Sequence, residues 1–145
     1  MLIYIDGDSC PVKQEVYRVA TRFQVKVMLV ANGWMQTPPG GNVELVLVKD
    51  AFDEADNWIV EKVLPADVVI TSDIPLAARC LEKGARVLDP RGRPFTDDSI
   101  GNALADRELM NFLRDFGDIG GGPAPFSRKD RSKFLQSLDE MLRKR

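Results

Sequence analysis

The sequence contains no histidine and only two cysteines, Cys10 and Cys80. Without histidine, Ser-His and Cys-His catalysis, histidine metal ligands and histidine-based pH switches are all excluded. Two cysteines that do not form a C-x-x-C motif exclude a zinc site and a dithiol redox motif. The remaining chemistry is mostly that of carboxylates, in which Asp outnumbers Glu 15 to 7. Short acidic side chains are the usual ligands of hard cations.

Long apolar runs are also missing. No stretch approaches the roughly 20 residues that a transmembrane helix needs. The first residues, MLIYIDGDSC, have no basic segment and reach an acid at position 6, which argues against a signal peptide. We therefore expect a cytoplasmic protein with no membrane partner, and nothing in the sequence favours one oligomeric state.

The chain is long enough for one folded domain, with 145 residues of which 44% are hydrophobic and 29% charged. The charge is unevenly distributed: residues 1–125 carry 13 Lys and Arg against 19 Asp and Glu, whereas residues 126–145 carry 7 against 3. An acidic body with a basic C-terminal end fits a nucleic-acid partner contacted through that end, and fits a solvated terminal helix equally well.

Short apolar runs predict five strands, at residues 2–5, 25–31, 43–48, 67–71 and 85–88. Helical spacing predicts helices at residues 11–23, 53–64, 75–83 and 98–116, and a last one that carries the apolar residues of 134–142. This alternation predicts a three-layer α/β/α fold around a central, mainly parallel, five-stranded sheet. We expect one α/β domain at residues 1–117, with a Gly-rich segment and C-terminal helix at 118–145 packing on it.

Acidic residues follow the predicted strands where ligands bind parallel sheets, at the carboxyl ends. Asp6 and Asp8 follow the first strand and Asp73 follows the fourth, while Asp56 lies on the apolar stripe of a helix. Like charges 4 Å apart repel by roughly 4 kcal/mol at an effective dielectric constant of about 20, a cost that a divalent cation removes. We predict Mg²⁺ or Mn²⁺ bound by Asp6, Asp56 and Asp73, with Asp8 beside it. Metal-bound water would then attack a phosphodiester.

Several groups are candidates for contacting phosphate. The backbone amides at the start of the first helix, residues 10–13, form a potential anion site. Arg93 lies beside a second arginine in the loop PRGRP after the fifth strand. The predicted substrate contacts are Lys13, Thr71, Ser72, Arg91 and Arg107.

The candidate acids also have structural interpretations. Asp53 is more typical of a helix N-cap than of a ligand, and Asp56 is equally compatible with a first-turn helix partner and with function. Asp73, two residues before Pro75, is a natural N-cap, and Asp89 before Pro90 is typical of a turn.

Other candidates have similar alternatives. Lys13 is equally compatible with a surface lysine, and Arg107 with an arginine whose stem covers apolar surface. Trp34, in the long loop NGWMQTPPGGN, is a candidate for stacking on a base, although a lone loop tryptophan more often packs over the core. The pair Ser127 and Asp130 favours a capped helix after the Gly-rich segment.

The segments DGDSCPVK, VVITSDIPLA, VLDPRG and GGGPAPFSRKDRSKF occur in this order along the chain. Together they resemble the bacterial YaiI/YqxD family, an uncharacterised family that has been grouped with PIN-like nucleases, and the likeness covers essentially the whole chain. The resemblance implies a PIN-like fold and an acidic site dependent on Mg²⁺ or Mn²⁺. PIN nucleases place acids after the first strand, on a following helix and after the fourth strand, positions that match Asp6, Asp56 and Asp73. Asp8 and Asp89 are possible supplements, and the fourth PIN acid is matched only loosely.

Two other function classes remain open. LIYIDGDS is similar to the opening of haloacid-dehalogenase-type phosphatases, with Asp6 as nucleophile, Asp8 as general acid and Thr71 in a second motif. Against this, the late pair Asp97–Asp98 follows RGRPFT and is typical of a helix start. The third class is a non-catalytic nucleic-acid-binding or interaction module. We carry forward the nuclease hypothesis, with RNA as the partner by analogy with PIN domains.

Overall fold

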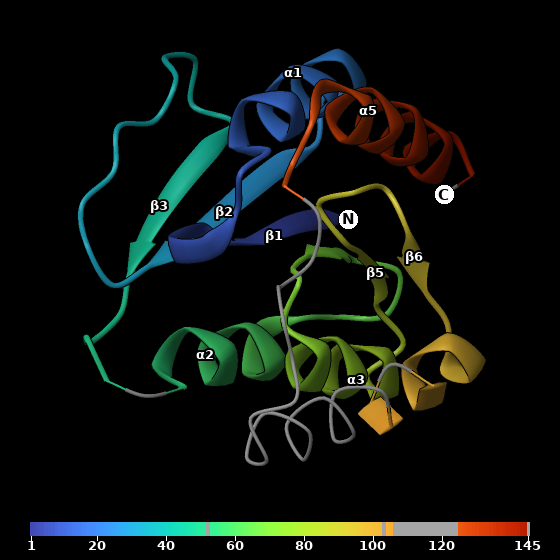
Figure 1. Cartoon of the computed structure of the whole chain (residues 1–145). Helices are drawn as coiled ribbons and strands as arrows, with labels where there is room; N and C mark the ends of the chain where they lie inside the picture. The colour runs from blue at the N-terminus through green and yellow to red at the C-terminus, as the bar shows by residue number, and fades with distance from the viewer. Residues whose placement is uncertain (52, 103, 106–124, 145) are drawn as a thin grey trace.

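The computed structural model describes residues 1–51, 53–102, 104–105 and 125–144. Its centre is a six-stranded sheet with the strand order β3-β2-β1-β4-β5-β6 (Figure 1). The first five strands are parallel, and β6 pairs antiparallel with β5. The strands are β1 (Leu2–Asp6), β2 (Lys26–Ala31), β3 (Val43–Leu47), β4 (Val68–Ile70), β5 (Arg86–Leu88) and β6 (Pro94–Phe95). The predicted fold class is confirmed, with one additional strand.

The sixth strand was not predicted because it is too short to show an apolar pattern. It has only two residues, Pro94 and Phe95, and forms when the chain reverses direction after β5. The reversal is a tight turn in which Gly92 adopts a φ of +85°. The backbone N–H of Asp89 donates to the carbonyl oxygen of Arg93 at 3.0 Å. The turn residues, rather than strand propensity, therefore create the strand.

Helices cover both faces of the sheet. On one face lie α1 (Lys13–Phe23) and α5 (Arg128–Arg143), which also contact each other. On the other lie α2 (Glu54–Lys62) and α3 (Ile74–Glu82) (Figure 1). Two apolar cores result, one on each side of the sheet. Residues 97–102 begin a further helix, as predicted, and its expected continuation over 106–116 lies outside the described residues.

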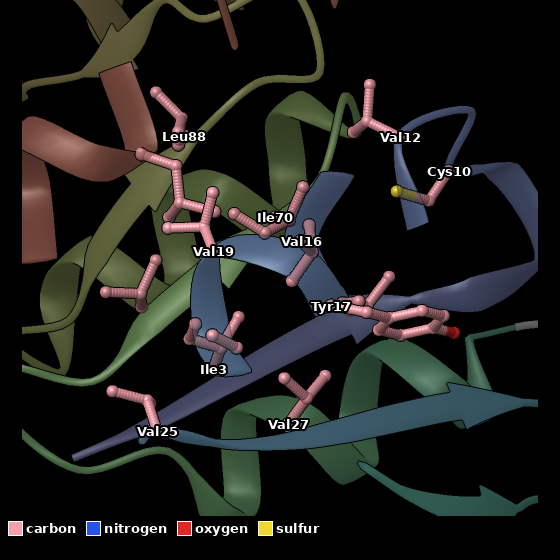
Figure 2. Packing of buried hydrophobic residues seen from close by; sticks show 14 of the residues in the cluster. Ile3, Cys10, Val12, Val16, Tyr17, Val19, Val25, Val27, Ile70 and Leu88 are labelled. Carbon is pink, nitrogen blue, oxygen red and sulfur yellow. The ribbon is translucent and has the colours of Figure 1, made fainter. Parts of the chain in front are cut away.

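The alternation of side chains along the buried strands divides these two cores. Ile3 and Ile5 of β1 face the core under α1 and α5, whereas Tyr4 faces the core over α2 and α3. Figure 2 shows the first core, in which Val16 and Val19 of α1 lie among strand residues. The C-terminal helix belongs to this core through three fully buried side chains, Phe134, Leu138 and Leu142. The boundary expected at residues 117–118 lies outside the described residues.

The first helix starts later than predicted. Gly7–Ser9 continue β1 as a 3₁₀ turn, η1, so that α1 begins at Lys13 and not at Pro11. Its N-cap is Val12, and no side chain caps it.

Asp53 occupies the N-cap position of α2, as expected, but its backbone is left-handed, with a φ of +63°, and its side chain forms no cap bond. The capping interpretation of Asp53 is therefore wrong in its mechanism. Within the part of the chain described above, no helix is long and apolar enough to cross a membrane.

Candidate functional site

The parallel pairing of β1 and β4 brings two of the predicted acids to one edge of the sheet. Ile5 is in register with Ile70, so the next residues of both strands leave the sheet side by side. Asp6 is the last residue of β1, and Asp73 follows β4 as the N-cap of α3. α2, which carries Asp56, contacts β1, β2 and α3.

The pKa of Asp56 shows that the charges of the other acids act on it. Its side chain is half-buried on α2, and its pKa is raised from 3.8 to about 6. Burial is the largest cause, followed by the negative charges of Asp73, Asp6 and Asp53. We call Asp6, Asp56 and Asp73 the acidic triad, because the charges of Asp6 and Asp73 both act on Asp56.

One cation opposes this repulsion. Arg79 of α3 lowers the pKa of Asp56, although less than the other causes raise it. No sequence pattern indicated Arg79, because its approach to Asp56 depends on how α2 packs against α3. It is the functional candidate that sequence reasoning missed.

Asp73 has a structural role as well. Its Oδ1 accepts a hydrogen bond from the backbone N–H of Leu76 at 3.0 Å, so the N-cap interpretation is confirmed. Thr71 is buried, and its Oγ1 accepts from the backbone N–H of Asp73 at 3.0 Å. Thr71 thus orients Asp73, whereas the neighbouring Ser72 is exposed at the same edge. A capping carboxylate uses one oxygen for the helix and keeps lone pairs for a cation.

Asp8 is exposed on η1, and its Oδ2 accepts from the backbone N–H of Asn32 at 3.2 Å. The amide of Asn32 in turn donates to Oδ1 of Asp50 at 3.0 Å. Asp8 therefore ties the end of β1 to the loop after β2.

Lys13 does not extend freely toward a ligand. Its Nζ donates to the carbonyl oxygens of Gly7 and Cys10, each at 2.9 Å, and so closes η1. Two of the three ammonium protons are occupied by these bonds. Lys13 thus holds the turn beside Asp6, and its contact with phosphate stays a prediction.

The arginines after β5 are engaged by the C-terminal helix and the turn. Arg91 is half-buried, and its Nη1 donates to Oδ2 of Asp130 at 3.1 Å. Its guanidinium lies 5.7 Å from the ring centroid of Phe126. Arg93 pairs with Asp89 at 3.1 Å. Arg91 therefore anchors α5 through Asp130 and Phe126, and its contact with phosphate stays a prediction.

Asp89 is a turn residue, as favoured from the sequence. Its Oδ1 accepts from the backbone N–H groups of Arg91 and Arg93 at 2.8 and 3.2 Å. The expected cap of the last helix is also present, since Ser127 and Asp130 form a capping box at the start of α5. Arg107, the remaining predicted substrate contact, lies outside the described residues.

The donor set suits an open metal site. Among the described residues, no three His, Cys, Asp or Glu side chains stand together as a ready-made ligand group. Mg²⁺ rarely uses such an all-protein cage, and usually combines one or two carboxylates with water and substrate phosphate. Asp6, Asp56 and Asp73 supply hard oxygen donors whose repulsion a cation would relieve. These residues fit a cation that substrate oxygens help to coordinate.

Trp34, for which the sequence favoured packing over the core, is exposed instead. The exposed fraction of the residue is 76%. Met35, the next residue, packs against the core under α1 in its place.

Comparison with known proteins gives a consistent family result. Residues 4–144 match the family model described as "Uncharacterized BCR, YaiI/YqxD family". A UPF0178 protein of Rhodospirillum centenum is 54% identical over 144 residues, which cover 97% of this chain and 94% of that protein. A UPF0178 protein of Paramagnetospirillum magneticum is 51% identical over 140 residues, covering 97% and 93%. A third, from Rhodopseudomonas palustris strain TIE-1, is 51% identical over 142 residues, covering 98% and 90%.

Proposed function

Since the chain belongs to the YaiI/YqxD family, and since that family has been grouped with PIN-like nucleases, we propose that it is a metal-dependent nuclease. The substrate is RNA, and the reaction is hydrolysis of a phosphodiester at the carboxyl edge of the sheet. We further propose that it acts in the cytoplasm. RNA is chosen over DNA by analogy with PIN domains.

The observation that carries the proposal is the raised pKa of Asp56 beside two further carboxylates. Burial is its largest cause, and the charges of Asp73, at the N-cap of α3, and Asp6, at the end of β1, add to it. A fold that needed only stability would neutralise or pair such groups. Their retention at the ligand-binding edge of a parallel sheet supports a cation site.

Each residue of the edge then has a defined task. Asp6, Asp56 and Asp73 would hold Mg²⁺ or Mn²⁺, which supplies a nucleophilic water at neutral pH and neutralises phosphate charge. Asp56 must first lose its proton, and Arg79 favours that loss. Thr71 holds Asp73 in place. The exposed Ser72 can donate its hydroxyl to a phosphate oxygen.

Hydrolysis of a fluorescently labelled RNA provides the test. Wild type and the variants Asp6→Asn, Asp56→Asn and Asp73→Asn are incubated with the RNA in millimolar Mn²⁺, in Mg²⁺ and in a chelator. We expect cleavage that requires the metal and falls on the order of a hundredfold in the Asp6→Asn variant.

Glu61→Gln is the matched control, because Glu61 is an exposed acid on the same helix as Asp56. This variant should cleave at the wild-type rate. Cleavage that survives all three triad substitutions, or that persists in the chelator, contradicts the proposal. A folded wild-type protein that binds RNA without cleaving it in either metal would indicate the non-catalytic module.

A further inference from the structure

Trp34 is the most exposed large apolar residue of the described chain, at 76%. Asp6 is in register with Val30 of β2, so the chain that carries Trp34 leaves the sheet beside Asp6. Two residues before Trp34, the backbone N–H of Asn32 donates to Asp8. The indole is thus attached to the same sheet edge as the candidate catalytic acids.

The loop holds Trp34 from both sides. On one side, Asn32 is bonded to Asp8 on η1 and to Asp50 after β3. On the other, Met35 packs against the core under α1. Only Gly33 separates Trp34 from the first anchor. A tryptophan with fixed neighbours and an exposed ring is presented to solvent by the fold, at the cost of the apolar area it leaves unburied.

The surroundings of the loop indicate what the ring binds. Asp8 and Asp50 lie on either side of Asn32, so phosphate would be repelled from this part of the edge. A nucleobase carries no charge at neutral pH, and its flat face stacks well on an indole. We propose that Trp34 is a stacking platform for an unpaired base, so that this edge takes a single strand and not a duplex. This inference rests on the proposed function for the identity of the ligand.

The distinction between strands follows from access to the base. In a duplex both faces of each base are stacked on neighbouring pairs, whereas a base in a single strand can be turned onto an aromatic side chain. Trp34 therefore selects the strand state of the substrate, while the acidic triad acts on its backbone.

Fluorescence of Trp34 gives a direct reading. The protein has two tryptophans, and the other, Trp58, is half-buried with its ring centroid 6.1 Å from that of Tyr4. In the variant Trp58→Phe, emission reports Trp34 alone. We expect saturable quenching by a short single-stranded RNA, and little quenching by the same RNA annealed to its complement.

Affinity for the labelled single strand is measured alongside by fluorescence anisotropy. Trp34→Ala should weaken binding by about tenfold, and Trp34→Phe, which keeps a ring, should recover most of it. Leu64→Ala is the matched control, since Leu64 is also exposed, at 64%, in the loop before β4. That loop lies at the opposite, amino end of the sheet. The Leu64→Ala variant should bind the single strand as tightly as wild type does.

The inference is overturned if Trp34→Ala binds the single strand as tightly as wild type, or if duplex quenches Trp34 equally well. It is also overturned if the emission changes only with protein concentration, which would make a second copy of the chain the occupant. A chromogenic phosphodiester with no nucleobase separates the two proposals. Metal-dependent hydrolysis of that compound, combined with single-strand binding that Trp34→Ala leaves unchanged, refutes the stacking platform alone. Stacking without hydrolysis refutes the nuclease alone.

Discussion

Two groups of acids lie near the carboxyl edge of the sheet, and different partners face them. Beside α5, Asp89 and Asp130 each face a guanidinium, from Arg93 and Arg91. In the acidic triad, Asp56 is near the like charges of Asp73 and Asp6. The pKa of Asp130 is lowered, first by its hydrogen bond with the backbone of Ser127 and further by Arg91 and Arg93. The pKa of Asp56 is raised, first by burial and further by Asp73 and Asp6.

The contrast separates charges that stabilise the folded structure from charges that destabilise it. Asp130 caps α5 and receives Arg91, so its ionised form is useful to the native structure. Ionised Asp56 is partly desolvated and repelled, so the native structure disfavours it. Substitutions at the first group are expected to destabilise the protein, and neutralisation of Asp56 is expected to stabilise it.

The largest expected effect is at the docking of α5. A Cβ added to Gly92 would lie 2.8 Å from the carbonyl carbon and oxygen of Lys133, which are backbone atoms and cannot turn aside. The φ of +85° adds strain for any other residue. Gly92→Ala should cost about 3 kcal/mol or more, measured by urea unfolding.

Gly101→Ala provides the matched comparison, because Gly101 is in the helix that begins at residue 97 and nothing lies within 4 Å of its added Cβ. Alanine is favoured over glycine in a helix by roughly 0.5–1 kcal/mol, so this variant should be slightly more stable. Equal stabilities of the two variants would show that α5 does not pack on the turn as described.

Two substitutions of Asp73 distinguish its role as the N-cap of α3 from its proposed role as a metal ligand. Asp73→Ala removes both the cap of α3 and the charge, and should cost about 1 kcal/mol. Asp73→Asn keeps an oxygen that can accept from Leu76, and should cost only a few tenths of a kcal/mol. Both should abolish the response to Mn²⁺. A metal response retained by Asp73→Ala would remove Asp73 from the site.

The pH dependence of stability in Asp56→Asn tests whether the ionised carboxylate of Asp56 destabilises the folded protein. Because the folded pKa is raised to about 6 from 3.8, protonated Asp56 is compatible with folding, and stability falls as pH rises through that range. After allowance for solvent screening at a half-buried group, neutralisation should stabilise the protein by about 1 kcal/mol at pH 8. At pH 3, where both states are protonated, the variant should match wild type. Chemical unfolding at these two pH values measures the difference, and a variant that is less stable at pH 8 would contradict the repulsion.

The smallest effect is expected at Arg93. Its side chain is 67% exposed, and its partner Asp89 is also held by two backbone N–H groups. Arg93→Ala should change the free energy of unfolding by less than about 0.5 kcal/mol, because exposed ion pairs contribute little. A loss above 1 kcal/mol in the same unfolding assay would show that this pair contributes more than its exposure allows.

Features carried by local pattern were predictable, and those set by packing were not. Buried runs such as that ending at Asp6 identified five strands, and the order of strands and helices placed the acidic triad at one edge. β6 escaped prediction because a turn around Gly92 creates it. The pairing of Arg91 with Asp130 and Phe126 was not predicted because these partners lie far away in sequence. The exposure of Trp34 was not predicted, because the neighbouring Met35 packs against the core instead.

Thermal unfolding of wild type and Asp6→Asn, with and without millimolar Mn²⁺, tests the central claim most directly. A ligand that binds only the folded state at a hundred times its Kd stabilises it by about 2.7 kcal/mol, which raises the Tm by several degrees. The account predicts this rise in wild type and in Glu61→Gln, and its loss in Asp6→Asn. An equal rise in Asp6→Asn, or no rise in wild type even with RNA present to complete the coordination, would contradict a cation site at the acidic triad.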